Sequence, residues 1–187
     1  MRRTLISDGS RRVVVLHGLG GIGKTQLAVS YMQRYRDEYS AIFWFNINDQ
    51  ASIEQSFTRV ARQILQQHPD TKPLSTIDLQ GDQGEVIDTV KAWLSLPGNT
   101  RWLLVFDNYD NPQLSNQTNN GAIDINRFLP ASWQGSIIVT TRLSQVDIGH
   151  RISIKKLENI QDGMEILSST SGRGDLSNSK YIKHIIY

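Results

Sequence analysis

The most informative part of the chain is the stretch Gly18-Leu19-Gly20-Gly21-Ile22-Gly23-Lys24-Thr25. It follows the β-branched run 12–17, which predicts a buried strand, and it opens a helical pattern. Glycine permits the positive φ angles and the open backbone with which a loop of N–H groups surrounds a phosphate chain. The stretch matches the complete G-x-x-x-x-G-K-[ST] pattern of a phosphate-binding loop, or P-loop.

The P-loop predicts which residues bind a purine nucleoside di- or triphosphate. A helix beginning at about Gly23 directs its dipole and free N–H groups at the phosphates. Lys24 is expected to reach the β- and γ-phosphates, and the Thr25 hydroxyl is expected to ligate Mg²⁺. The predicted nucleotide-binding residues of this segment are Gly18, Gly20, Gly21, Ile22, Gly23, Lys24, Thr25 and Gln26.

Two further positions, each at the end of a predicted strand, extend the site. Asp107 ends the apolar run 102–107, where a Walker B aspartate holds Mg²⁺ through water. Arg142 follows the apolar run 136–140, and its guanidinium is expected to contact the γ-phosphate and to report which nucleotide is bound. An ordinary strand-terminating aspartate and a surface arginine are the alternatives, and the P-loop favours the functional interpretation of both.

Apolar runs and helical periodicities alternate along the rest of the chain. The periodicity of residues 53–65 predicts an amphipathic helix with Ser52 as its N-cap, and another helix is expected at about 85–94. Residues 67–84 form a predicted loop, and the Asn-rich segment 108–126 is expected to be an exposed, mobile excursion. The predicted strands are 12–17, 41–46, 102–107, 136–140 and 151–154.

This order predicts an α/β protein with the three-layer P-loop NTPase fold and a mostly parallel five-stranded sheet. Residues 1–11 are expected to be a short lead-in solvated by arginines, and residues 12–156 the nucleotide-binding domain. Residues 157–167 are expected to start a helical subdomain. The composition of residues 168–187 predicts a poorly ordered tail.

Composition limits the functional classes. The 187 residues suit one domain, and their net charge of +2 requires no broad basic surface for nucleic acid. No window is apolar enough to span a membrane, and the start lacks the features of a signal peptide. Cysteine is absent, so neither disulfides nor thiolate metal sites are expected. A cytoplasmic protein is the simplest interpretation.

The motifs, taken in order, resemble those of the NB-ARC family of signal-transduction ATPases with numerous domains (STAND), which includes plant resistance proteins and apoptotic protease activators. Residues 18–28 resemble the family's GxGGxGKTxLA, residues 41–45 its second-strand motif, residues 102–110 its Walker B segment and residues 135–142 its sensor strand. The Asp-Asn pair at 107–108 is most similar to fungal members. The resemblance covers about residues 12–167.

The resemblance implies a molecular switch of the kind found in innate immunity: ADP holds the resting form, and exchange for ATP permits oligomerisation. It implies that Lys24 and Thr25 bind phosphate and Mg²⁺, Asp107 the metal and Arg142 the γ-phosphate. Members commonly have an acidic residue where this chain has Asn108, and asparagine cannot act as a general base. Hydrolysis is therefore expected to be slow or absent. Asp107 and Asp110 are the candidate catalytic carboxylates.

Other family features are not matched, and we expect a switch core without its lid. The segment that frames adenine upstream, the Gly-x-Pro motif and the winged-helix histidine have no counterpart, so adenine preference rests on the resemblance alone. Three functions stay open: a regulatory ADP/ATP-binding module that self-associates, a non-catalytic fragment or decoy that binds a full-length NB-ARC relative, and an autonomous ATPase or small-molecule kinase. No nucleic acid or membrane partner is expected.

Overall fold

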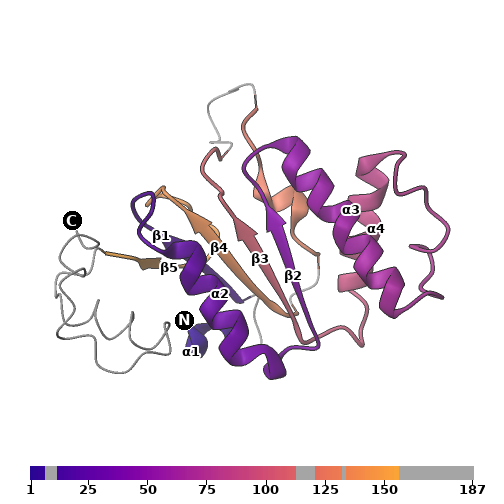
Figure 1. Cartoon of the computed structure of the whole chain (residues 1–187), viewed down its shortest axis with the longest axis horizontal. Coiled ribbons are helices and arrows are strands. Elements are labelled where there is room, and N and C mark those ends of the chain that lie inside the picture. Colours follow the sequence, from indigo (N-terminus) through magenta and orange to yellow (C-terminus); the bar gives the residue numbers. More distant parts are fainter. Residues whose placement is uncertain (7–11, 113–120, 132–133, 156–187) are drawn as a thin grey trace, which may run out of the picture. The chain divides into compact units, whose positions relative to one another are not determined.

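The computed structural model describes residues 1–6, 12–112, 121–131 and 134–155. Its centre is one five-stranded sheet in which every pairing is parallel, with the order β2-β3-β4-β1-β5 (Figure 1). The strands are β1 (Arg12–His17), β2 (Ala41–Asn46), β3 (Trp102–Asp107), β4 (Ser136–Thr141) and β5 (His150–Ser153). The predicted α/β fold with a parallel five-stranded sheet is confirmed.

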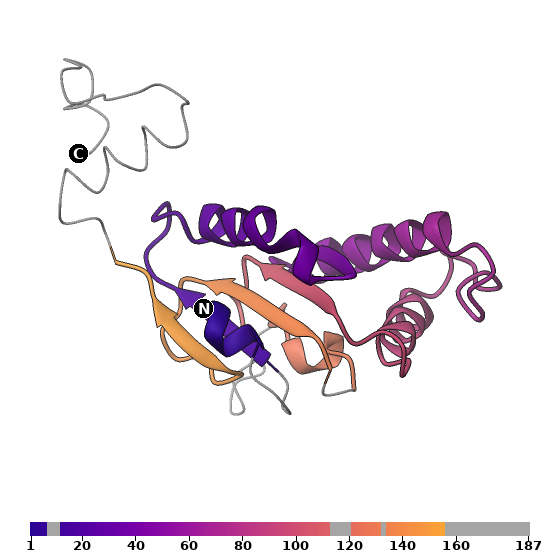
Figure 2. The ribbon, with the colours of Figure 1, turned by 90° about the horizontal axis from the view of Figure 1, so that it is seen from below.

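Helices occupy both faces of the sheet and make a three-layer arrangement. Figure 2 shows α2 on one side of the strands and α4 with η2 on the other. The helices are α1 (Arg2–Ile6), α2 (Lys24–Tyr35), α3 (Gln50–Gln67) and α4 (Gln83–Leu94), with 3₁₀ turns η1 (Arg36–Glu38) and η2 (Ile125–Phe128).

Alternating strand residues separate the core into two clusters. On one face Val14, Leu16 and Ile138 pack with Ala28 of α2 and Leu5 of α1. On the other face the aromatic side chains of β2 and β3 pack with α3, α4 and η2; the Phe45 ring lies 4.9 Å from Phe106 and 4.6 Å from Phe57. All six residues of β3 and of β4 are buried, as expected for central strands of a parallel sheet.

The strand order brings three loops of the site to one edge of the sheet. Leu16 and His17 of β1 pair with Thr140 and Thr141 of β4, while Phe106 of β3 pairs with Val139. Parallel strands end at the same edge, so the residues that follow β1, β3 and β4 are neighbours. The nucleotide-binding residues predicted from distant segments therefore converge here.

The segment before β1 contains a helix that sequence analysis did not predict. Leu5 of α1 is fully buried, and its carbonyl accepts hydrogen bonds from Ser136 Oγ at 2.9 Å and from Arg12 Nη1 at 3.3 Å. Arg2 pairs with Glu38 of η1 at 2.7 Å. Leu5 of α1 thus belongs to the core of the unit that contains the sheet.

Several predicted boundaries need correction. Ser52 is not the N-cap of α3: the helix begins earlier, at Gln50, because the Asp49 side chain accepts a hydrogen bond from the Ser52 backbone N–H at 2.8 Å. The next helix likewise begins at Gln83 because Asp82 caps it. The fourth strand extends to Thr141, and the fifth comprises His150–Ser153.

The prediction that residues 108–126 form an exposed excursion was wrong at both ends of that segment. Tyr109 is 4% exposed and donates its hydroxyl to the Ile123 carbonyl, and Ile123 and Ile125 are buried in the core. Burial raises the pKa of the Tyr109 hydroxyl. Apolar side chains among the asparagines return the chain to the core, which the average polarity of the segment conceals. Residues 113–120 lie outside the described part of the chain.

Residues Met1–Ile154 form one compact unit and Lys155–Tyr187 a second. The predicted subdomain start, 157–167, and the predicted tail, 168–187, lie outside the described residues. Within the described part of the chain, no helix is both long enough and apolar enough to cross a bilayer.

Candidate functional site

The P-loop has the backbone geometry that its glycines permit. Gly21 and Gly23 have φ angles of 75° and 98°, in the region that glycine adopts most readily. Gly18 has φ 152°, and a Cβ at this position would collide with the carbonyl oxygen of Ile154, whose N–H bonds to the His17 carbonyl. The loop therefore passes closely over the residue that follows β5.

The loop leads directly into α2. Gly23 occupies the N-cap position, and no side chain caps the helix. The first N–H groups of a helix need acceptors and lie at its positive end. This end of α2 can therefore receive an anion, while the nearby turn is held by an Ile22 N–H bond to the Leu19 carbonyl.

Lys24 is the first residue of α2 and turns back over the loop. It is 9% exposed, and its Nζ donates to the carbonyl oxygens of Gly18 and Leu19, both at 2.9 Å. An ammonium group has three N–H donors. The two bonds hold the ammonium against the loop and leave one donor for a phosphate oxygen.

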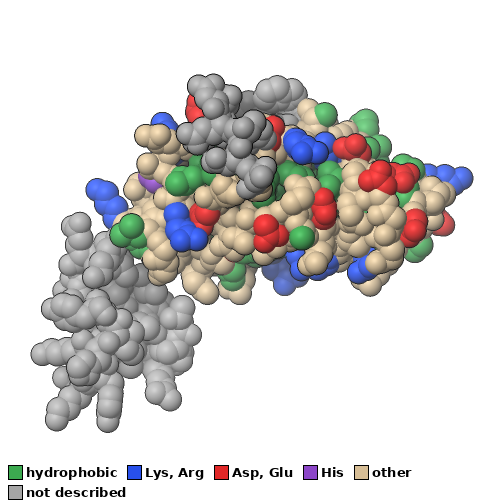
Figure 3. Space-filling model, turned by 90° about the horizontal axis from the view of Figure 1, so that it is seen from above, with side chains coloured by type: hydrophobic (Ala, Val, Ile, Leu, Met, Phe, Trp, Pro, Cys, Tyr) green, Lys and Arg blue, Asp and Glu red, His purple; other side chains and the backbone are tan. Residues whose placement is uncertain are grey.

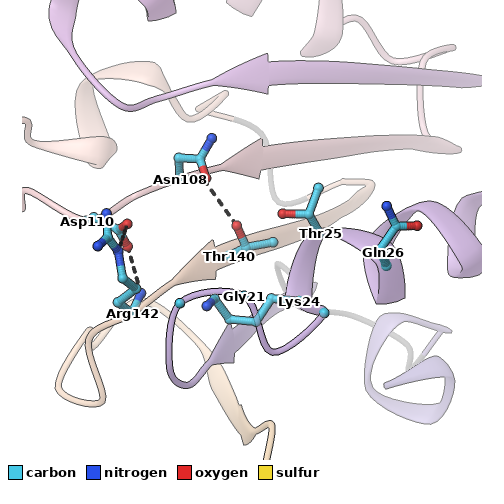
Figure 4. Close-up of a pocket in the computed structure, with 10 residues that line it drawn as sticks. Gly21, Lys24, Thr25, Gln26, Asn108, Asp110, Thr140 and Arg142 are labelled. Atoms are coloured by element: carbon cyan, nitrogen blue, oxygen red, sulfur yellow. Dashed lines mark hydrogen bonds and ion pairs between the residues drawn. The ribbon is translucent and has the colours of Figure 1, made fainter. Parts of the chain in front are cut away.

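Asp107 connects three elements behind the loop. Its Oδ1 accepts hydrogen bonds from Thr25 Oγ1 of α2 at 2.9 Å and from Thr140 Oγ1 of β4 at 2.5 Å. The Asn108 N–H in turn donates to Thr140 Oγ1 at 3.1 Å (Figure 4). Asp107 is 6% exposed, so these bonds compensate a carboxylate withdrawn from water.

Arg142 and Asp110 form an ion pair on the side of the site opposite Gln26 (Figure 4). Arg142 Nε donates to Asp110 Oδ2 at 2.5 Å, and the Arg142 backbone N–H donates to Asp110 Oδ1 at 2.6 Å. Figure 4 shows this pair on the far side of the pocket from Gln26. Both residues are candidates from the sequence, but only the structure shows that they pair.

Most predicted residues surround one pocket of about 350 Å³. Gly18 and Ile22 belong to the same loop without lining the pocket, and Asp107 is bonded to the lining residue Thr25 without lining the pocket itself. Sequence analysis missed the contribution of Thr140, although its place as a strand end beside β1 was a usable signal. The lining residues are Gly20, Gly21, Gly23, Lys24, Thr25, Gln26, Asn108, Asp110, Thr140 and Arg142.

The oxygen atoms at the base of the pocket fit Mg²⁺. Thr25 Oγ1 gives its proton to Asp107, so its lone pairs face away from that bond, and carboxylate and hydroxyl oxygens are suitable Mg²⁺ ligands. The described residues contain no cluster of three or more His, Cys, Asp or Glu that could enclose a metal. The Thr25 hydroxyl and the Asp107 carboxylate suit a cation held by one or two protein groups together with phosphate oxygens and water.

Asn108 has φ 69°, a left-handed conformation that asparagine tolerates better than most residues. Its Nδ2 donates to Asn46 Oδ1 at 3.3 Å, which links the ends of β3 and β2.

Charge is mixed on the face seen in Figure 3, where Lys and Arg side chains are interspersed with Asp and Glu, and its described residues form no broad basic area.

Comparisons with known proteins found a matching family and a similar protein. A family model described as the NB-ARC domain matches residues 1–175. A nucleotide-binding leucine-rich repeat (NLR)-like protein of Hyaloscypha variabilis is 29% identical over 137 residues, which are 69% of this chain. The match covers only 13% of that relative's length.

A solved structure, Cdc6p from Pyrobaculum aerophilum, aligns with 91% of this chain and 46% of its own, with a TM-score of 0.53. The two sequences are 14% identical, so this similarity concerns the fold alone.

Proposed function

The chain belongs to the NB-ARC domain family, and from that premise we propose that it is a regulatory switch module that binds ADP or ATP with Mg²⁺. The observation that carries the proposal is that one pocket is lined by the P-loop, by Thr25, which donates to Asp107, and by Arg142. A diphosphate can bind to the loop and Lys24, whereas a third phosphate can also contact the guanidinium of Arg142 on the other side of the pocket. Such a pocket can respond differently to the two nucleotides.

The proposed roles follow from the hydrogen bonds. Lys24 keeps a donor for a phosphate oxygen, and the uncapped end of α2 supplies backbone N–H groups. Thr25 and Asp107 would hold Mg²⁺, which when bound neutralises phosphate charge and fixes phosphate geometry. Arg142 would contact the γ-phosphate. The preference for adenine follows from family membership, and comparison with GTP tests it.

Hydrolysis is proposed to be slow or absent. Asn108 follows the Walker B aspartate, and an amide cannot take a proton from water. Asp110, which lines the pocket, has both oxygens bonded to Arg142, and this leaves it poorly placed as a general base. Asp107 already accepts hydrogen bonds from two hydroxyl groups at its Oδ1. Binding and exchange, rather than turnover, would then set the state of the module.

Self-association or binding to a longer relative, a signalling role in innate immunity and a cytoplasmic location stay predictions based on the resemblance and composition. The chain matches 13% of the length of its NLR-like relative.

Thermal unfolding with Mg²⁺-ADP, Mg²⁺-ATP and Mg²⁺-GTP tests the proposal. A nucleotide at 100 times its Kd should stabilise the fold by about 2.7 kcal/mol. Lys24→Ala should abolish the shift, because it removes the ammonium that faces the phosphates. Lys72→Ala, the same change at an exposed position in the loop between α3 and α4, is the control and should keep it. A wild-type transition that no nucleotide moves would contradict the proposal.

A further inference from the structure

The pairing of Asp110 with Arg142 is more specific than an ion pair between two side chains. One carboxylate binds the backbone N–H of Arg142 through Oδ1 and the side-chain Nε through Oδ2. These two bonds fix both the start and the end of the aliphatic part of the arginine. Because an arginine has three guanidinium nitrogens, a bond through Nε leaves both terminal nitrogens for another ligand. Among the described residues, neither terminal nitrogen has a hydrogen-bond partner.

The fixed arginine lies beside the P-loop. A Cβ added to Gly20 would be 3.8 Å from Arg142 Cδ, so the arginine passes along the loop that surrounds the phosphates. Arg142 and Asp110 both line the pocket. Their side chains are 63% and 19% exposed, respectively, so the carboxylate is the less solvated partner. An exposed arginine would otherwise sample many rotamers, and the Asp110 bonds reduce that freedom before a ligand binds.

The charge of Asp110 gives the pair a second property. A carboxylate on the wall of a phosphate pocket repels a polyanion, and the repulsion increases with the number of phosphates. Arg142 compensates this charge by a direct contact. The same carboxylate therefore helps triphosphate binding when Arg142 is present and opposes it when Arg142 is absent.

We propose that Asp110 is a positioning residue that confers triphosphate specificity by holding Arg142 toward the third phosphate. This inference rests on the proposed nucleotide-binding function and deepens it. Asp110 itself does not contact the nucleotide; it acts through the arginine. The consequence is that the effect of removing the Asp110 charge reverses its sign when Arg142 is removed.

A double-mutant cycle tests that reversal. The Kd values of Mg²⁺-ADP and Mg²⁺-ATPγS are measured by calorimetry for wild type, Asp110→Asn, Arg142→Ala and the double variant. Their ratio reports triphosphate preference and cancels effects common to both nucleotides. Asp110→Asn retains the oxygen that accepts the Arg142 N–H but loses the charged contact to Nε. We expect it to lower the preference about tenfold, the value of one hydrogen bond to a charged group.

In the Arg142→Ala background, Asp110→Asn should instead raise ATPγS affinity, because it removes an uncompensated negative charge. Arg142→Lys keeps the charge without the fork of donors and should lose most of the preference. Asp147→Asn makes the same charge change at an exposed position between β4 and β5 and is the control. Retained cooperative unfolding of each variant identifies a binding effect as local.

The outcomes separate the two proposals. Suppose that wild type binds both nucleotides and that Asp110→Asn changes the triphosphate preference in the same direction with and without Arg142. The role of Asp110 is then overturned, and the nucleotide-binding function stands. An unchanged preference in Asp110→Asn has the same meaning. If wild type binds neither nucleotide, both proposals fail.

Discussion

Asp107 illustrates how much of this site depends on one atom. Its Oδ1 accepts hydrogen bonds from the hydroxyl groups of Thr25 and Thr140, and Thr140 Oγ1 in turn accepts one from the Asn108 N–H. A buried carboxylate needs such donors, and the donors gain fixed orientations. Asp107 thereby orients the Thr25 hydroxyl oxygen. In the proposed site Asp107 would position this metal ligand in addition to binding the metal through water.

Asp107→Asn is expected to raise the Mg²⁺ concentration at which Mg²⁺ has half of its effect on ADP binding. An amide keeps the size of the carboxyl group but loses its charge, and it cannot accept two hydroxyl protons as strongly. Losing a group that orients metal ligands typically costs 10–100-fold in metal affinity. Titrating Mg²⁺ at fixed ADP, with EDTA-treated protein as the zero point, measures the change. An unchanged Mg²⁺ midpoint would contradict this role of Asp107.

At the scale of elements, caps decide where the helices begin. Asp49 accepts from the Ser52 N–H, and Asp82 accepts from the Gly84 N–H, so both helices start at a glutamine that the apolar periodicity does not include. The periodicity locates the buried face of α3 correctly: Ile53, Phe57, Val60 and Ile64 are all in the core. Burial pattern and helix start are separate properties, because the first turn of a helix can be entirely polar.

Asp49→Ala is expected to lower the midpoint of thermal unfolding, whereas Ser52→Ala, which keeps the backbone donor, should lower it less. The pKa of Asp49 is depressed, first by the Ser52 backbone N–H and then by the Ser52 hydroxyl and Asn48. A depressed pKa in the folded state stabilises the protein above the ordinary value of 3.8. That contribution disappears as pH falls through the folded-state pKa.

The control is Asp49→Asn, which keeps an accepting oxygen without a titratable proton. The difference in midpoint between wild type and Asp49→Asn should therefore be larger at neutral pH than below the folded-state pKa. A difference independent of pH would exclude the proposed contribution of the Asp49 charge.

At the scale of the whole molecule, the strand order creates the site and α1 completes one face of the core. β1 lies between β4 and β5, so the P-loop faces Arg142 on one side and the residues after β5 on the other. Figure 1 shows α1 near the start of β1, at the end of the strand away from the P-loop. Residues before the first strand thus stabilise the strands that present the site without entering it.

Leu5→Ala is expected to destabilise the fold by about 2–5 kcal/mol, the usual range for truncating a fully buried leucine. Urea unfolding of the whole chain measures the loss. Arg3→Ala, an exposed change in the same helix, is the matched control and should have little effect. Equal urea midpoints for Leu5→Ala and wild type would show that α1 does not contribute to the core.

The sequence by itself determined the class of fold and most nucleotide-binding candidates. Strand bounds for 12–17, 41–46 and 102–107 agree with the structure, because continuous apolar runs report burial on both faces of a parallel sheet. The P-loop was recognisable because its eight residues are contiguous, and because glycines occur at the positions where the loop needs positive φ angles. The five-residue α1 was missed because one buried leucine makes no periodic pattern.

Only the tertiary structure decided which side chains act together. Thr25 bonds with Asp107 across 82 positions in the chain, and Asp110 with Arg142 across 32. Local patterns carry no information on such pairs, since the partners are chosen by the order of β3, β4 and β1 in the sheet. The same holds for Tyr109 and Ile123, which are buried in a segment of polar composition. Periodicity shows which residues of one helix or strand are buried. Which side chains bond across the site depends on which strands are neighbours in the folded sheet.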